Sequence, residues 1–369
     1  MAKLIEITGE ALSGEWGLED ESRTGIPVLR TTNFTNLGII NYGNVVTRNI
    51  TKKNISEKFL RKGDIIIEKS GGSDKQPVGR VVLFNGEENR FLFNNFTGVL
   101  RVKDREKWVP DYVFYALFAN YRNGGTRKYE NKTTGLHNLK TDLYINNYEI
   151  EWINIAEQKN VCATLRKIES IISDMNKEID YLDELIKARF VEMFKDEDPV
   201  FAFDDVLIDD TKNGFKLDSS NYSNLGKIAI VDQGQKRICG YINAVDGKAP
   251  WSKEAIIFGD HTEMFKYINF PFYLGADGAK LLSPKNGWNA RFLYHYLDVN
   301  YHKRLGYMRH FKYLKEMSFI KPDLDRQEEF CMFCTQVDKS KFALSNELTM
   351  GNFYIRLIHD CIMHGSIDL

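Results

Sequence analysis

The sequence predicts an α+β protein with two domains of mixed α/β, β-rich structure that are separated by long helical spacers. Three observations predict this architecture. A strict apolar seam occupies the middle of the chain, a second seam lies near its end, and an internal repeat places one seam after each copy. With 369 residues the chain is long enough for two or three domains with separate cores.

The first seam lies in residues 161–190. Its apolar residues recur at alternating steps of four and three, and most positions between them are charged or polar: Val161, Leu165, Ile168, Ile172, Met175, Ile179, Leu182 and Ile186. So narrow a stripe fits one partner helix, whereas a helix inside a globular core would show a wider apolar face. We therefore expect a coiled coil or helical hairpin here rather than a core helix, ended by Pro199.

The second seam follows the same steps less strictly, through Phe330, Phe333, Val337, Ser340, Leu344 and Leu348. Gly351 comes directly after it and is a poor helix former. We therefore expect the second helical region to be shorter than the first and to be interrupted at Gly351. Two seams on one chain can pair with each other.

The internal repeat is clearest where residues 98–121 align with residues 278–301 at a constant offset. Trp108 meets Trp288 in this alignment, and each copy continues into a basic segment and a glutamine, Gln158 or Gln327, that opens a helical seam. Residues 63–85 and 226–243 also share a strand–turn–strand pattern, and we expect them to be equivalent. The predicted order is therefore domain (1–155), spacer (156–197), domain (198–322), and shorter spacer with tail (323–369).

Positive charge is concentrated in the segments that follow the two repeat helices. The formal net charge is only -1, so a nucleic-acid surface must come from local clustering. Such segments neutralise phosphates while neighbouring polar side chains meet base edges. A solvated basic face is the alternative, but the same position in both repeats favours DNA or RNA contact. The candidates are Arg122, Arg127, Lys128, Lys132, His137 and Lys140, and then Lys303, Arg304, Arg309, His310 and Lys312.

Motifs of catalysis are missing from the sequence, which has neither a phosphate-binding P-loop nor a dinucleotide-binding glycine pattern. Asp64, Glu68 and Lys69 suggest nuclease chemistry only faintly, because their order differs. Cys331 and Cys334, with His359 downstream, could hold zinc, yet both cysteines lie on an apolar seam where burial explains them better. We expect no catalytic residue and no metal ligand on this chain.

Five scattered cysteines suit a reducing compartment, and no apolar leader or membrane span is visible. The expected location is therefore the cytoplasm.

In its order of segments the chain resembles the specificity subunits of type I restriction–modification systems. The resemblance rests on residues 25–40 and 60–82 in the first repeat, and on 228–243 and 271–284 in the second. It implies two target-recognition domains, each reading one half of a bipartite duplex DNA sequence. It also implies that the helical regions pair as an antiparallel coiled coil, set the gap between the half-sites and dock two methyltransferase subunits.

The same resemblance places the chemistry on partner chains. The methyltransferase would carry S-adenosylmethionine and methylate adenine, and a restriction subunit, if present, would use ATP and Mg²⁺; this chain would hold no cofactor. By position, the resemblance adds the turn at 70–75, with Ser70, Ser73 and Lys75, to the expected DNA contacts. Two alternatives stay open: a self-contained type II-like restriction or methylation protein, and a coiled-coil scaffold that does not bind DNA.

Overall fold

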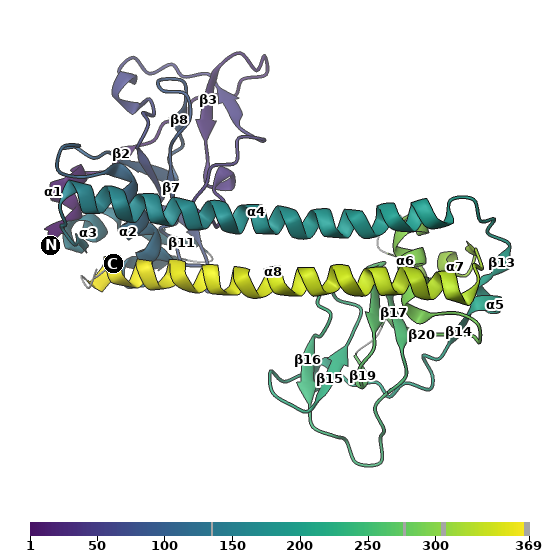
Figure 1. Ribbon diagram of the computed structural model, residues 1–369. Helices are drawn as coiled ribbons and strands as arrows, with labels where there is room; N and C mark the ends of the chain where they lie inside the picture. Colours follow the sequence, from purple (N-terminus) through teal and green to yellow (C-terminus); the bar gives the residue numbers. More distant parts are fainter. Residues whose placement is uncertain (134–135, 276–277, 304–307, 365–369) are drawn as a thin grey trace. The chain divides into compact units, whose positions relative to one another are not determined.

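The structure is a computed structural model, and it describes residues 1–133, 136–275, 278–303 and 308–364. The chain divides into two compact units. The first combines Met1–Asp174 with the residues from Glu347 onward, and the second is Met175–Asn346. Two long helices, α4 (Ile155–Phe194) and α8 (Leu324–His364), each contribute residues to both units (Figure 1).

The first unit contains an antiparallel four-stranded sheet in the order β2-β9-β5-β7 and a three-stranded sheet in the order β4-β3-β8. Within the smaller sheet, β3 and β8 are parallel. The strands are β2 (Leu12–Ser13), β3 (Ile26–Leu29), β4 (Val46–Arg48), β5 (Ile65–Glu68), β7 (Val81–Leu83), β8 (Leu92–Phe93) and β9 (Thr97–Leu100). Strands such as β5, with Ile65, Ile66 and Ile67 all fully buried, are near-continuous apolar runs because both faces are covered.

Helix α2 (Pro110–Arg122) packs on the larger sheet and buries most of its side chains in the same core. Proline at its first position suits a helix start, where no backbone donor is needed. The unit is completed by α1 (Leu4–Thr8), α3 (Thr141–Asn147), the pair β1 (Ala2–Lys3) with β12 (Glu149–Ile150), and a third sheet of β6 (Ser70–Gly72), β10 (Glu130–Thr133) and β11 (Leu136–Leu139).

The second unit repeats this plan, with a four-stranded sheet β14-β20-β17-β18 and a three-stranded sheet β16-β15-β19 whose β15 and β19 are again parallel. Its elements are β13 (Phe201–Ala202), α5 (Phe203–Val206), β14 (Leu207–Asp209), β15 (Ile228–Val231), β16 (Gly240–Ile242), β17 (Ala255–Gly259), β18 (Phe265–Ile268), β19 (Phe272–Leu274), β20 (Ala279–Pro284), α6 (Ala290–Asn300), α7 (Phe311–Leu314) and β21 (Ser318–Phe319).

The alignment of 98–121 with 278–301 holds in the structure, because β9 and α2 correspond to β20 and α6. The proposed equivalence of 63–85 and 226–243 is wrong. Strands β5 and β7 correspond to β17 and β18, whereas β15 and β16 correspond to β3 and β4. Both sheets contain an antiparallel strand–turn–strand unit, and the local pattern does not distinguish one sheet from the other.

Helices α4 and α8 pack against each other in antiparallel fashion within each unit. In the second unit, three ion pairs join the two helical segments: Asp183 with Lys341, Arg189 with Glu329, and Glu197 with Arg326. Residue numbers rise along the first segment as they fall along the second, so the two segments run antiparallel. In the first unit, Gly351 lies against Ile172, since a Cβ added to this glycine would sit 3.1 Å from the Cγ1 atom of Ile172.

The expected interruption of the second helix at Gly351 is wrong. Helix α8 continues through Gly351 and has 41 residues against 40 in α4, so it is not the shorter one. A glycine inside a helix costs about 1 kcal/mol relative to alanine. Close packing on α4 outweighs that local preference. No helix within the described ranges is both long and apolar enough to cross a membrane.

Candidate nucleic-acid interface

The third sheet of the first unit brings the turn at 70–75 against the basic segment 121–140. Its order is β10-β11-β6, and β11 pairs His137 with Gly72 and Asn138 with Ser70. A further hydrogen bond, from the Gln76 amide nitrogen to the Tyr121 hydroxyl at 3.2 Å, ties the turn to the end of α2. Two segments that were separate predictions from the sequence therefore form one surface.

His137 is buried beneath this surface and holds it in place. Its Nδ1 atom lies 2.9 Å from the Glu130 carboxylate and its Nε2 atom lies 3.5 Å from that of Asp74. The other Glu130 oxygen accepts the backbone N–H of Val78 at 3.0 Å. Only 8% of the His137 side chain and 3% of the Glu130 side chain are exposed. The position of His137 favours a role in holding the turn over the direct DNA contact expected from the sequence.

The lysines and arginines of this segment lie on its solvent-exposed side. Arg127 donates to the carbonyl oxygen of Asp74 at 3.1 Å, so the basic segment and the turn are joined again on the exposed side. Ser70 is partly buried and Ser73 is exposed. The structure describes the backbone of Lys132 in β10, while its side chain lies outside the described residues. The exposed cations are Lys75, Arg122, Arg127, Lys128 and Lys140.

A groove of about 720 Å³ runs beside the third sheet. Its lining includes the predicted contacts Ser70 and Lys140, together with residues that were not predicted from the sequence. The sequence holds one signal for Phe96, which is an apolar residue that directly follows two asparagines in a turn between strands. The lining residues are Ala11, Ser13, Lys69, Ser70, Asn95, Phe96, Asn138, Leu139, Lys140, Thr141, Asp142 and Leu143.

The second unit builds its basic segment differently. Lys303, Arg309 and Lys312 are exposed, and Arg304 lies outside the described residues. His310 is 1% exposed; its backbone N–H donates to the Asp260 carbonyl at 2.9 Å and its Nδ1 atom lies 3.3 Å from the Glu263 carboxylate. Like His137, it is placed to position the loop.

Between β17 and β18 the chain makes a short turn, where the first unit has the long loop that contains β6. In the part of the chain that the structure describes, the second unit has no counterpart of the third sheet.

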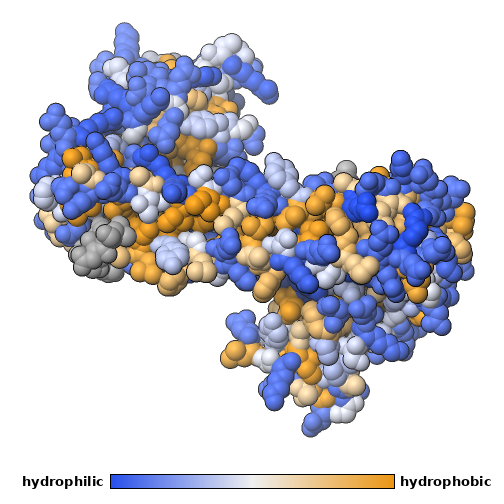
Figure 2. Space-filling view, viewed as in Figure 1, coloured by the Kyte–Doolittle hydropathy of each residue, from blue (hydrophilic) through white to orange (hydrophobic). Residues whose placement is uncertain are grey.

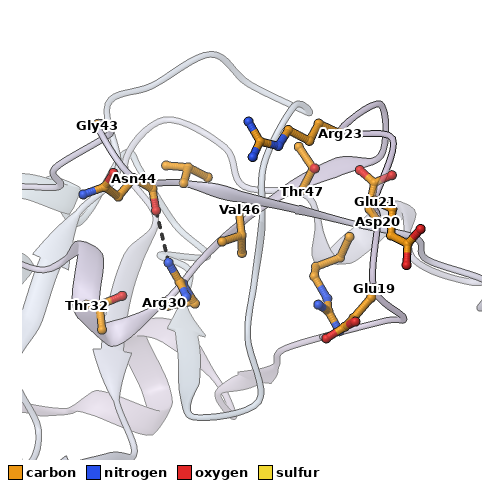
Figure 3. Close-up of a pocket in the computed structure, with 12 residues that line it drawn as sticks. Glu19, Asp20, Glu21, Arg23, Arg30, Thr32, Gly43, Asn44, Val46 and Thr47 are labelled. Atoms are coloured by element: carbon orange, nitrogen blue, oxygen red, sulfur yellow. Dashed lines mark hydrogen bonds between the residues drawn. The ribbon is translucent and has the colours of Figure 1, made fainter.

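A second concave surface of the first unit lies over β3 and β4 and measures about 1120 Å³ (Figure 3). Arg30 reaches the carbonyl of Asn44 at 3.1 Å, and the loop with Glu19, Asp20 and Glu21 lies at the other end (Figure 3). Hydrogen bonds from Thr47, Ser22 and the Gly25 N–H lower the pKa of Asp20 to about 2, so this rim is anionic. With both signs of charge present, this surface suits phosphate less well than the basic segments do.

The carboxylates with nuclease-like spacing are engaged in structural ion pairs. Asp64, fully buried before β5, receives two hydrogen bonds of 2.7 Å from Arg101. Glu68, at the other end of β5, pairs with Arg80 at 3.2 Å, and burial raises its pKa. The two groups are therefore held apart by the length of a strand and each is neutralised by an arginine.

Cys331 and Cys334 belong to the hydrophobic core of the second unit, where burial raises the pKa of each thiol to about 12. Neutral thiols are poor metal ligands. Across the described ranges, no three His, Cys, Asp or Glu side chains converge as a metal site.

The apolar seam of α4 follows the sheltered side of the helix. Val161, Leu165 and Ile186 are buried, and the first two of these belong to the core of the first unit. Ile186 joins Phe330, Cys334 and Val337 of α8 in the core of the second unit. The remaining seam residues are partly buried: Ile168, Ile172, Met175, Ile179 and Leu182.

Comparison with known proteins identifies the fold. A solved S subunit of a type I restriction–modification system from M. genitalium matches with a TM-score of 0.58 and 15% identity, over 98% of this chain and 95% of that one. A chain from a structural study of assembly and conformational transition in a type I system matches with the same score and identity, over 99% and 97%. This chain has the fold of a type I specificity subunit. The α+β class and the resemblance expected from the sequence are confirmed.

A curated relative supports the likeness in sequence. It is named "Putative type I restriction enzyme MjaX specificity subunit", from Methanocaldococcus jannaschii, and is 21% identical over 253 residues. The match covers 67% of this chain and about half, 53%, of the relative. No protein-family model matches the chain.

Proposed function

We propose that this chain is the DNA-specificity subunit of a type I restriction–modification complex. Each of its two domains, residues 1–155 and 198–322, reads one half of a bipartite duplex sequence. The observation that carries the proposal is the repeat itself: two units that share the four-stranded sheet and the mixed three-stranded sheet, each with exposed cations after its repeat helix. A bipartite reader needs two such modules, and cations supply the sequence-independent part of DNA affinity.

The proposed contacts to DNA divide into two kinds. Exposed cations bind phosphates, and the polar side chains of the 70–75 turn approach the bases. His137 and His310 do not contact DNA in this proposal and instead hold these loops in place, because each is buried beside a glutamate. The proposed contacts are Ser70, Ser73, Lys75, Arg122, Arg127, Lys128, Lys132, Lys140, Lys303, Arg304, Arg309 and Lys312.

The helical spacers, 156–197 and 323–369, would set the gap between the half-sites and dock two methyltransferase subunits. A helix of 40 residues is roughly 60 Å long. Both units expose large apolar side chains on these helices, and Figure 2 shows apolar surface along them near the C-terminus. One set in each unit suits two copies of a partner. The sets are Ile171, Met350, Phe353, Tyr354 and Leu357, and Tyr181, Leu185, Met332 and Phe342.

In this proposal the chain is not an enzyme. The methyltransferase partner carries S-adenosylmethionine, a restriction subunit would use ATP and Mg²⁺, and the complex works on DNA in the cytoplasm. The neutralised pair Asp64 and Glu68 counts against a self-contained nuclease. The exposed basic segments count against a scaffold without DNA binding, which would have no use for them.

A single-molecule map of adenine methylation in host DNA tests the proposal, with the gene intact and deleted. We expect one bipartite methylation motif to disappear on deletion. A gene in which the proposed phosphate-binding cations are replaced by alanine should fail to restore the motif, whereas the wild-type gene should restore it. A map that is the same with and without an expressed gene would contradict the proposal.

A further inference from the structure

Phe96 stands out among the exposed residues of the first unit because its turn is rigid. Its side chain is 58% exposed, yet Thr97 beside it is fully buried. The Thr97 hydroxyl donates to the Asn94 carbonyl at 2.9 Å, and the backbone N–H groups of Lys69 and Ser70 donate to the Phe96 carbonyl at 2.8 and 3.3 Å. The backbone therefore holds the ring in the solvent at a fixed place.

Single exposed apolar side chains are common on protein surfaces and need no explanation. Phe96 differs because it lines the groove of about 720 Å³ beside the third sheet. Lys69 and Lys140 supply positive charge there, Asn95 and Asn138 supply amides, and Asp142 is the one acid among the lining residues. Burial lowers the pKa of Lys69, and Asp142 partly offsets this effect.

An aromatic face, amide groups and lysines are the combination that binds an unstacked nucleotide. Bases stack on aromatic rings whatever their sequence, amides meet base edges, and lysines neutralise the phosphates. An intact duplex hides its base faces, so only a nucleotide that has left the stack offers a face to Phe96. Methyltransferases that act on bases take their target out of the stack, so unstacked nucleotides occur in the DNA of such a complex.

The second repeat does not share this feature. At the constant offset that aligns the two repeats, Ala276 takes the position of Phe96, and it lies outside the described residues. An alanine offers no ring for stacking, so the aromatic residue at this position belongs to the first repeat alone.

We propose that the groove at Phe96 holds one unstacked nucleotide of the bound DNA, with its base on the Phe96 ring and its phosphates near Lys69 and Lys140. The inference rests on the proposed function, since it requires DNA on this domain.

Three fluorescein-labelled probes test the proposal with the full chain at low salt: a duplex, the same duplex with one bulged thymidine, and a short oligothymidylate. We expect the Phe96→Leu variant to bind the bulged duplex and the oligothymidylate roughly ten-fold more weakly, and the intact duplex as well as wild type does. Phe96→Trp should restore binding. Trp152→Leu, which changes another exposed aromatic residue of the first unit, should bind all three probes like wild type.

The outcomes separate the two proposals. If wild type binds the intact duplex but Phe96→Leu weakens none of the probes, or weakens all three equally, the nucleotide groove is wrong and the DNA-reading function stands. The groove is also wrong if Trp152→Leu matches the loss of Phe96→Leu. If wild type binds none of the duplexes at low salt, the DNA-reading function itself is wrong.

Discussion

Gln158 and Gln327 occupy the same place in the two repeats and make the same hydrogen bonds. Each is fully buried at the start of a long helix. Gln158 accepts the N–H of Val109 at 2.8 Å and donates to the carbonyls of Lys107 and Ile153. Gln327 accepts the N–H of Asn289 at 2.9 Å and donates to those of Gly287 and Pro322. One side chain thus joins the strand–helix turn of each domain to the spacer that follows.

Replacing either glutamine by alanine should destabilise the chain strongly. Each variant removes a fully buried side chain and leaves one N–H and two carbonyl groups without their partner, and unsatisfied buried groups cost about 1–3 kcal/mol each. We expect a loss of about 2–4 kcal/mol in the free energy of unfolding, measured by urea denaturation. Gln336→Ala, on the exposed side of α8, should stay within about 0.5 kcal/mol of wild type. Equal effects at Gln158 and Gln336 would contradict the shared role.

Removing Lys303, Arg309 and Lys312 together should weaken DNA binding and flatten its salt dependence. The logarithm of affinity falls with that of salt by about 0.9 for each phosphate neutralised on a duplex. We therefore expect the slope, from fluorescence anisotropy at several salt concentrations, to drop by up to about 3 units. A control lacking the exposed lysines Lys167 and Lys339 of the long helices and Lys195 directly after α4 should keep the slope. An unchanged slope in the first variant would move the DNA surface elsewhere.

His137→Ala should weaken DNA binding without changing its salt dependence. The variant removes the group that joins Glu130 to the 70–75 turn, and loss of a buried hydrogen-bonded partner costs about 1–3 kcal/mol. Lys128→Ala, which removes an exposed cation, should instead lower the salt slope by about one unit. If His137→Ala lowered the slope as Lys128→Ala does, His137 would be a direct phosphate contact.

His295 should make the second unit acid-sensitive. Burial, with smaller effects from the charges of Arg291 and Lys341, lowers its pKa from 6.5 to about 3. Between these values the unfolded chain binds a proton that the folded chain does not. Stability from this group is therefore complete above pH 6.5 and falls by about 1.4 kcal/mol per pH unit as the pH drops towards 3.

The difference in unfolding free energy between wild type and His295→Gln, followed from pH 7 to pH 4, measures this effect. The variant should be less sensitive to acid than wild type. His302→Gln, at an exposed position, should follow wild type across the range. Parallel curves for wild type and His295→Gln would show that His295 takes up a proton in the folded chain.

The long helices could be predicted because their signal is local. An apolar residue every three or four positions reports a helix face, whatever surrounds it. The end of α8 could not, because Gly351 is a local stop signal that packing on Ile172 overrides. Strand pairing was harder still. The contact of β6 with β11 and the correspondence of β5 with β17 depend on long-range topology that no local pattern contains.

The positive charge of the candidate interface could be predicted from the sequence, but the burial of its individual side chains could not. A run of lysines and arginines shows in the sequence, but the burial of His137 and His310 depends on Glu130 and Glu263, which fold against them. Phe96 was missed for the opposite reason. An apolar residue next to a strand is usually part of the core, and only the fold shows that its ring faces solvent.

The first unit is built from two separate segments of the chain, and this has a consequence for its biosynthesis. Leu4 and Ile7 share one hydrophobic core with Ile358 and Ile362, whereas the second unit is a single continuous stretch. A ribosome therefore delivers every residue of the second unit before the first can close its core. The domain that is translated first is the one that finishes folding last, and its apolar surface must be shielded from aggregation in the meantime.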